Sequence, residues 1–229
     1  RGRVAADFWR AHPRIHRTLH GGTDHRLCRG VAWRLRVGAL RVVGWGMPKP
    51  ATHHLPGDLS PRQILERAIR VDHAGEFGAV RIYAGQMALM KNGPAKDKIR
   101  KMAEQEAHHL ETFEALMTER RVRPTVLAPV WHVAGWALGA ATAAMGEKAA
   151  MACTVAVEDV IDEHYRGQAK QLEGTEPELC ATIEEFRVEE VEHKQMALNA
   201  GAEEAPGYLL MRLGIGAGSR MAIWLSERV

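Results

Sequence analysis

A repeated motif, Glu-x-x-His, most narrowly limits what this chain can fold into. It occurs at Glu106–His109 and again 84 residues later at Glu190–His193. Residues three apart lie on one face of an α-helix, so each motif projects a carboxylate and an imidazole in the same direction. A single glutamate precedes each motif by 30 and 32 residues, namely Glu76 and Glu158. The chain is therefore interpreted as two helix pairs, each supplying Glu and then Glu-x-x-His.

Helical wheels place all four of these glutamates among apolar residues, on the faces that a bundle would bury. Four carboxylates buried together without a cation would be prohibitively costly. The same pattern is typical of carboxylate-bridged di-iron and di-manganese four-helix bundles. It predicts a two-metal centre with the ligands Glu76, Glu106, His109, Glu158, Glu190 and His193. The alternative is a polar core in which these groups satisfy one another, and ligand spacing does not separate iron from manganese.

Two neighbouring residues compete with this ligand set. His108 lies about 100° from His109 on the wheel, which indicates a surface position or a place behind the ligands. Glu189 stands four residues before His193 and is a rival to Glu190. The internal repeat aligns Glu189 with Gln105, which argues against Glu189 as a ligand.

The chain from Ser60 onward is expected to be helical almost throughout. Ser60–Gln63 has the form of a capping box with proline at the first helical position, and this helix should run to about Met90. A second helix should follow Pro94 and end before Arg123.

The second half of the chain shows the same signals. The stretch from Pro129 to about Leu172 is too long for one helix and should break near Gly146. A second capping box at Thr175–Glu178 should open a helix that ends near Gly201, and a last helix should follow Pro206. No segment alternates as a strand does. The fold class predicted is all-α, a ferritin-like four-helix bundle with an additional apolar hairpin and C-terminal helices.

The segment Val126–Met145 is apolar, with His132 and Thr142 as its only strongly polar residues. It is dominated by alanine and glycine and contains Pro129 near its start. Three interpretations are open: a membrane span, a segment that touches or dips into a membrane, and a hairpin helix packed through small residues. Hydropathy favours membrane contact over a span.

Charge is concentrated at the N-terminus. Residues 1–46 hold ten arginines against two acids, a local charge of +8; since the whole chain carries +3, residues 47–229 carry −5. The basic segment is interpreted either as a mitochondrial targeting peptide, although it has no serine, or as an extension ahead of a start at Met47. The expected organisation is a leader at 1–46, a linker at 47–60 and one domain at 61–229. Nucleic-acid binding is not expected, because the excess positive charge belongs to the leader.

Several runs of the sequence resemble a known family, the 5-demethoxyubiquinone hydroxylases, which include the clock-1 proteins of ubiquinone synthesis. These runs are Arg70–Glu76, Gln86-Met87, Arg123–Thr125, Ala152–Glu158 and Ala222–Arg228. The resemblance covers essentially residues 61–229 and not residues 1–46.

The resemblance implies a ferritin-like di-iron monooxygenase that hydroxylates 2-polyprenyl-3-methyl-6-methoxy-1,4-benzoquinol with O2. It assigns Glu76, Glu106 and His109 to one iron and the other three ligands to the second, with Glu106 and Glu190 bridging. Many relatives carry Tyr at the position of Phe77, a departure that spares the ligand set.

Other residues receive roles from the same resemblance. His164 and Tyr165 are candidates for proton or electron transfer, with simple packing as the alternative. Arg67 and Arg220 are candidates for holding the quinone oxygen or an anionic reductant, with surface charge as the alternative. Trp224, where some members have Tyr, is a candidate for contact with the quinone or reductant.

The substrate's polyprenyl tail implies peripheral attachment to a membrane through Val130–Met145 and the last helix. The expected location is the cytoplasmic face of a bacterial cell membrane, or the matrix side of the mitochondrial inner membrane. The resemblance also implies assembly with other ubiquinone-biosynthesis proteins in some organisms. Three other functions compete: iron storage or ferroxidase activity, manganese catalase, and a metal-free membrane-associated helical adaptor.

Overall fold

The computed structural model describes residues 57–229, and this part of the chain is helical without a strand. It contains six α-helices and one short 3₁₀ helix, η1 (Ala202–Glu204). The α-helices are α2 (Pro61–Leu89), α3 (Pro94–Arg120), α4 (Ala128–Ala144), α5 (Glu147–Leu172), α6 (Pro177–Asn199) and α7 (Tyr208–Ser226). The all-α prediction is confirmed. The predicted leader at 1–46, the start at Met47 and most of the linker lie outside the described residues.

Most helix ends lie where the sequence predicts them. The Ser60 hydroxyl accepts from the backbone N–H of Gln63, and the Gln63 side chain accepts from the Ser60 N–H at 2.9 Å, which completes the capping box of α2. The break between α4 and α5 falls at Gly146, whose φ of 118° favours glycine. The long segment therefore divides as predicted.

The second predicted capping box, at Thr175–Glu178, is wrong. Helix α6 begins at Pro177, so Glu176 is the N-cap and no side chain caps the helix. The Thr175 hydroxyl instead donates to the carbonyl of Leu172, at 3.0 Å. The end of α5 thus uses the group that the motif assigned to α6, because the turn between these helices is short.

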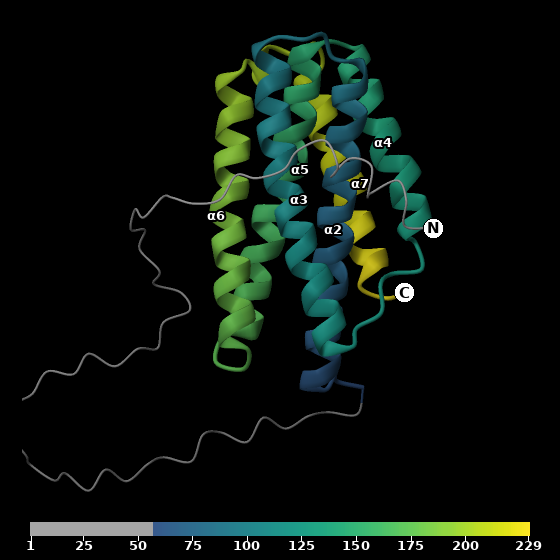
Figure 1. Cartoon of the computed structure of the whole chain (residues 1–229), viewed down its shortest axis with the longest axis vertical. Helices are drawn as coiled ribbons and strands as arrows, with labels where there is room; N and C mark the ends of the chain where they lie inside the picture. The colour runs from purple at the N-terminus through teal and green to yellow at the C-terminus, as the bar shows by residue number, and fades with distance from the viewer. Residues whose placement is uncertain (1–56) are drawn as a thin grey trace, which may run out of the picture.

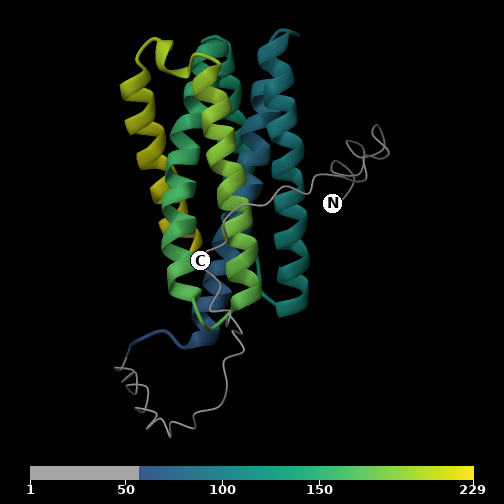
Figure 2. The ribbon, with the colours of Figure 1, turned by 90° about the vertical axis from the view of Figure 1, so that its left-hand side faces the viewer.

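The helices form two antiparallel pairs, α2 with α3 and α5 with α6, packed into a four-helix bundle (Figures 1 and 2). Helix α4 lies along the outside of α2 and returns the chain to the end of the bundle where α5 begins (Figure 1). Helix α7 packs on α5 and also contacts α2. The arrangement is a ferritin-like bundle with two additional helices on one side.

Helix α4 approaches α2 closely through glycine. A Cβ atom at Gly139 would lie 1.9 Å from the carbonyl oxygen of Ile82, and one at Gly85 would lie 2.1 Å from that of Trp136. Backbone meets backbone at this crossing, which only residues without a side chain permit. The expectation of a helix packed through small residues is confirmed for this face of α4. Among residues 57–229, no helix is both long enough and apolar enough to cross a membrane.

The bundle core consists of two apolar clusters. One contains Phe113, Leu172 and Ile183, and the other contains Ile99, Met102 and Met151, all of them buried. Tyr165 belongs to the first cluster and Tyr83 to the second. The hydroxyls of these two tyrosines contact two of the predicted ligands, so the clusters enclose a polar centre.

Candidate metal centre

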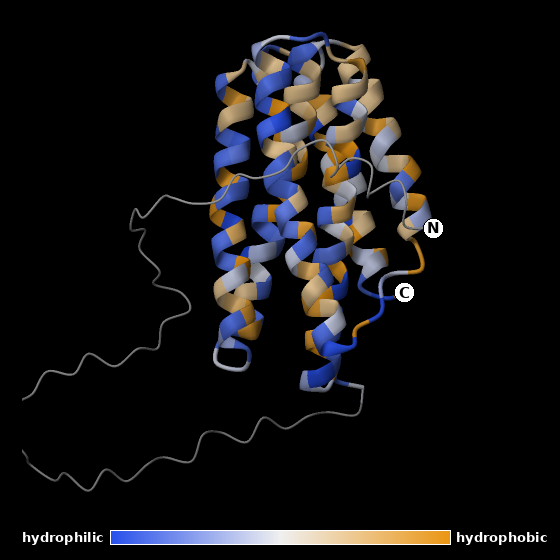
Figure 3. Ribbon diagram, viewed as in Figure 1, coloured by the Kyte–Doolittle hydropathy of each residue, from blue (hydrophilic) through white to orange (hydrophobic). Residues whose placement is uncertain are grey.

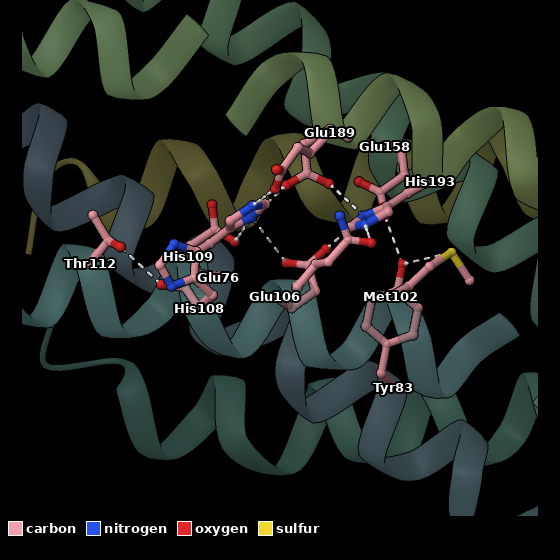
Figure 4. Close-up of polar contacts among 12 residues, drawn as sticks. Glu76, Tyr83, Met102, Glu106, His108, His109, Thr112, Glu158, Glu189 and His193 are labelled. Atoms are coloured by element: carbon pink, nitrogen blue, oxygen red, sulfur yellow. Dashed lines mark hydrogen bonds and ion pairs between the residues drawn. The ribbon is translucent and has the colours of Figure 1, made fainter. Parts of the chain in front are cut away.

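The six predicted ligands converge in the middle of the bundle. They come from α2, α3, α5 and α6, and none is more than 3% exposed. They form two overlapping groups (Figure 4), in each of which one ligand atom from every residue lies within 4.8 Å of the others. The first group is Glu76, Glu106, His109 and Glu190; the second is Glu106, Glu158, Glu190 and His193.

Two of the glutamates belong to both groups. Glu190 places one carboxylate oxygen 3.1 Å from His109 Nδ1 and the other 3.1 Å from His193 Nδ1. Glu106 Oε1 lies 3.1 Å from His193 Nδ1, and its Oε2 lies 4.0 Å from His109 Nδ1. Of the two histidines, Glu76 is close only to His109, whose Nδ1 lies 3.6 Å from Glu76 Oε2. Shared central carboxylates with one terminal glutamate on each side are the arrangement that two bridged metal ions require.

The chemistry of this donor set fits metal ions better than a self-satisfied polar core. Nδ1 of His109 and Oε1 of Glu106 are fully buried and make no hydrogen bond, although charged atoms lie nearby. A buried polar atom without a partner costs about 1–3 kcal/mol, so native structures rarely keep one without reason. Both orphaned atoms face the cluster, where a cation would satisfy them.

The pKa values of the cluster also indicate that positive charge is missing from it. Burial, together with Glu190, raises the pKa of Glu106 and of Glu158 well above its ordinary value. Burial alone would lower the pKa of His193, but Glu106 and Glu190 outweigh it and raise this pKa to about 10. Burial is likewise outweighed at Glu190, where the neighbouring imidazoles of His109 and His193 hold the pKa at about 2. Protons thus take the place of cations in the metal-free cluster.

We expect stabilisation by metal to increase with pH. Glu106 and Glu158 keep protons in the folded metal-free protein that the unfolded chain releases near pH 4.5, so folded stability falls as pH rises above that value. His193 acts in the same direction from pH 6.5, the ordinary pKa of a histidine, up to about 10. Metal ions need the deprotonated ligands. The rise in melting temperature on adding Mn²⁺ should therefore grow from about pH 5.5 to about pH 8. A constant or shrinking rise would contradict this cluster as the binding site.

Two tyrosines hold the terminal glutamates from opposite helices. The Tyr83 hydroxyl donates to Glu158 at 2.9 Å, and the Tyr165 hydroxyl donates to Glu76. Each tyrosine stands seven residues after the glutamate of its own helix. It donates, however, to the glutamate of the other helix, so the hydrogen bonds are exchanged between α2 and α5. In the sequence, Tyr83 lies among the apolar residues on the same helix face as Glu76, and its contact with Glu158 is not predicted. The shared spacing of seven residues is the signal that identifies it.

The outer nitrogens of the histidines also have partners. His109 Nε2 lies 2.6 Å from Glu189 Oε2, and His193 Nε2 lies 3.2 Å from Gln105 Oε1 (Figure 4). Glu189 therefore lies behind a ligand of the opposite helix pair. The interpretation of Glu190 rather than Glu189 as the central carboxylate agrees with this placement. His108 is exposed, and its ring is 6.2 Å from that of Phe186.

His164 connects the neighbourhood of the cluster to a polar cavity. Its Nε2 lies 3.3 Å from Oδ1 of Asp72, a buried residue one turn before Glu76. Burial, opposed by His164, raises the pKa of Asp72 to about 6. The cavity has a volume of about 310 Å³ and is lined by Arg67 and His164 among others. The transfer roles of His164 and Tyr165 remain predictions.

Two of the three candidate substrate residues lie near the polar cavity. Arg67 lines it, and Arg220 donates at 2.7 Å to Glu163, which also lines it. Trp224 is 53% exposed. The guanidinium of Arg228 stacks on the Trp224 ring at 4.2 Å. Their binding roles remain predictions.

A second cavity, of about 420 Å³, lies between α2, α4, α5 and α7. Its walls are almost entirely apolar and include Ile82, Leu138 and Ile215. Two of its lining residues, Gly75 and Val157, directly precede the ligands Glu76 and Glu158. The cavity therefore leads from the side of the bundle that α4 and α7 cover to the helices that hold the terminal glutamates. No pattern in the sequence predicts it.

Comparisons with known proteins identify the family of this chain. Residues 63–226 match the family described as ubiquinone biosynthesis protein COQ7. The chain is 52% identical over 182 residues to a 3-demethoxyubiquinol 3-hydroxylase of Rhodospirillum rubrum, covering 79% of this chain and 86% of the relative. It is 47% identical over 215 residues to the human NADPH-dependent 3-demethoxyubiquinone 3-hydroxylase, mitochondrial, covering 88% and 99%. A yeast 5-demethoxyubiquinone hydroxylase, mitochondrial, is 41% identical over 183 residues, covering 72% and 78%. The chain belongs to the COQ7 family of ubiquinone biosynthesis proteins.

Proposed function

We propose that this protein is a 3-demethoxyubiquinol 3-hydroxylase that uses two iron ions and O2 to hydroxylate the ring of a polyprenyl benzoquinol. The observation that carries the proposal is the six-ligand cluster beside an apolar cavity. Membership of the COQ7 family and the names of the relatives support the activity.

Each part of the cluster has a task in this reaction. Glu76 and His109 would hold one iron, Glu158 and His193 the other, and Glu106 and Glu190 would bridge them. A pair of ferrous ions supplies electrons and open coordination positions that activate O2 for insertion into the ring. Tyr83 and Tyr165 hold the terminal carboxylates by hydrogen bonds and so limit how far these ligands can shift.

The apolar cavity is proposed as the site of the quinol. Its walls exclude water from the reacting ring and bury the first part of the prenyl tail. Gly75 and Gly78 both line the cavity on α2, and Gly78 leaves open space where a side chain would stand. A flat ring could approach Glu76 along this side of the helix. Because neither Arg67 nor Arg220 lines this cavity, apolar contact rather than charge is expected to dominate quinol binding.

Filling this cavity should weaken quinol binding without removing metal. In Ala222→Phe, a side chain of α7 would enter the cavity, and we expect kcat/KM to fall by about tenfold or more through KM. Ala217→Phe on the exposed face of the same helix is the matched control. Steady-state kinetics and metal content measure the two effects. Equal kinetic losses in both variants would contradict the assignment of the cavity.

The function itself is tested in cells that lack the gene. Accumulation of demethoxyubiquinol and its correction by the wild-type gene would support the hydroxylase, while normal ubiquinone in the deletion strain would refute it. Purified protein loaded with iron should also transfer one atom of ¹⁸O2 to the product. Uptake of hundreds of iron ions per assembly would favour iron storage instead. Rapid disproportionation of peroxide would favour manganese catalase.

We propose further that the protein attaches to a membrane through α4 and α7. These helices carry exposed apolar side chains on the side of the bundle that contains the cavity, whereas α3 and α6 are largely hydrophilic outside (Figure 3). The exposed residues are Val130, Val133, Trp136, Leu209, Leu210, Leu213, Met221 and Trp224. Each fully buried side chain of this kind contributes roughly 1.5–3 kcal/mol, so a few suffice for reversible attachment. Trp131 is less available than Trp136, because its indole N–H donates to Ser226 at 3.0 Å.

Binding to vesicles should then depend on apolar residues more than on salt. Residues 47–229 carry −5, so attraction to anionic lipid is weak. We expect Trp136→Ser combined with Leu210→Ser to reduce co-sedimentation with phosphatidylcholine–phosphatidylglycerol vesicles, while raised salt leaves wild-type binding intact. Leu89→Ser, at the exposed end of α2, is a control. Salt-sensitive binding that ignores α4 and α7 would place the contact elsewhere.

The location proposed is peripheral, on the cytoplasmic face of a bacterial cell membrane, with the matrix side of the mitochondrial inner membrane as the alternative. Relatives of both origins support a quinone-containing membrane. Assembly with other ubiquinone-biosynthesis proteins is proposed on the family resemblance. Co-purification from membrane fractions of the source cells tests both points.

A further inference from the structure

The metal centre repeats itself almost perfectly between the two helix pairs. Glu76 corresponds to Glu158 and Tyr83 to Tyr165, each 82 residues later. Glu106 and His109 correspond to Glu190 and His193, each 84 residues later. In every one of these pairs the residue type is the same. If the residues around the ligands repeated in the same way, the two metal positions would have equal affinity.

The symmetry ends at the residues behind the histidines. Gln105 and Glu189 occupy the same position of the repeat, directly before the shared glutamates. Each accepts from the outer nitrogen of the opposite pair's histidine: Glu189 from His109 at 2.6 Å, and Gln105 from His193 at 3.2 Å. The imidazole of His109 is therefore hydrogen-bonded to a carboxylate, and that of His193 to a neutral amide.

The difference between a carboxylate and an amide at Nε2 changes the donor strength of Nδ1, the histidine atom that faces the metal. Nδ1 of each histidine faces the cluster, so Nε2 carries the proton and needs an acceptor. A carboxylate behind a histidine makes the ring a stronger electron donor and fixes its orientation, whereas a neutral amide oxygen does so less. Phe186 adds to the difference by stacking on the His109 ring at 3.9 Å between centroids.

We propose that Glu189 and Gln105 are positioning residues that make the two metal positions unequal, with the ion at Glu76 and His109 bound more tightly than the ion at Glu158 and His193. This inference rests on the proposed two-metal centre. Its consequence is stepwise loading: the position backed by Glu189 fills first and retains its ion when the other is lost.

Anaerobic titration with Mn²⁺ tests the inequality without turnover. The wild-type protein should bind two ions in two calorimetric steps, with an uncoupled six-line EPR signal at one equivalent and a spin-coupled spectrum at two. Glu189→Gln should weaken the tighter step by about 10–100-fold and bring the two steps together. Gln105→Glu should strengthen the weaker step. Glu192→Gln, exposed on α6, should change neither step.

The exchanged pairing has its own test. Glu189→Gln should have little further effect on the remaining site in a His109→Ala background and should keep its full effect in a His193→Ala background. The opposite result would mean that Glu189 supports the histidine of its own helix and would overturn the proposal. Circular dichroism of each metal-free variant separates misfolding from a changed affinity.

The outcomes separate the two proposals. Two equal Mn²⁺ steps, or a Glu189→Gln titration identical to the wild type, would overturn the inequality while leaving the hydroxylase standing. Unequal steps in a protein that does not hydroxylate the quinol would overturn the proposed function alone. A wild-type protein that binds no Mn²⁺, Fe²⁺ or Co²⁺ would overturn both.

Discussion

Hydroxylation by the Glu190→Ala variant is expected to fall at least about 100-fold, together with most of the bound iron. Replacing a group behind a ligand already costs about 10–100-fold in metal affinity or activity, and Glu190 is itself a ligand. It places one oxygen 3.1 Å from each histidine Nδ1, so its loss weakens both metal positions. Quinol turnover and iron per chain measure the result.

Glu192→Ala is the matched control for that experiment. Glu192 is exposed, two residues further along α6, and helix geometry turns its side chain away from the cluster. Iron content and turnover of this variant should remain within about twofold of the wild type, as expected for a surface position. Similar losses in Glu190→Ala and Glu192→Ala would show that the assigned register of α6 is wrong.

The second large effect is expected in stability, from Gly139→Ala. Its new Cβ would lie 1.9 Å from the Ile82 carbonyl oxygen, which belongs to the backbone of α2 and cannot rotate away. Helix α4 must therefore separate from α2, and we expect a loss of about 1–3 kcal/mol or more in the free energy of unfolding. Urea unfolding followed by circular dichroism measures it.

Gly167→Ala provides the same substitution in open space. Gly167 lies in α5, is exposed, and has no atom of a neighbouring residue within 4 Å of where a Cβ would stand. Alanine should stabilise the helix there by up to about 1 kcal/mol. Opposite signs at positions 139 and 167 would support the backbone contact between α2 and α4, and equal signs would exclude it.

The six candidate ligands could be predicted from the sequence because the signal that marks them is a short-range residue spacing. A spacing of three residues places Glu106 with His109, and Glu190 with His193, on one helix face, whatever the rest of the chain does. The cost of burying four carboxylates then predicts a metal centre before the helices are positioned. Most helix bounds are equally local, since Ser60, Pro94 and Gly146 act on their own neighbours.

The partners of those ligands could not be predicted in the same way. Glu189 is four residues from His193 along α6, yet its partner is His109 on α3. Tyr83 likewise holds Glu158 on α5 rather than its own helix's Glu76. Both pairings depend on how two distant helices are rotated about their axes, and no short-range rule contains that rotation.

The sequence by itself therefore determined the helices, the two-fold repeat and the identity of the six candidate ligands, because each follows from residue type and helical period. Only the tertiary structure decided the exchanged hydrogen bonds and the apolar cavity. The exchanged hydrogen bonds arise where α3 packs against α6, and the apolar cavity arises where α2, α4, α5 and α7 pack together. Such packing is set by contacts between residues far apart in the chain, such as His109 against Glu189 and Gly139 against Ile82.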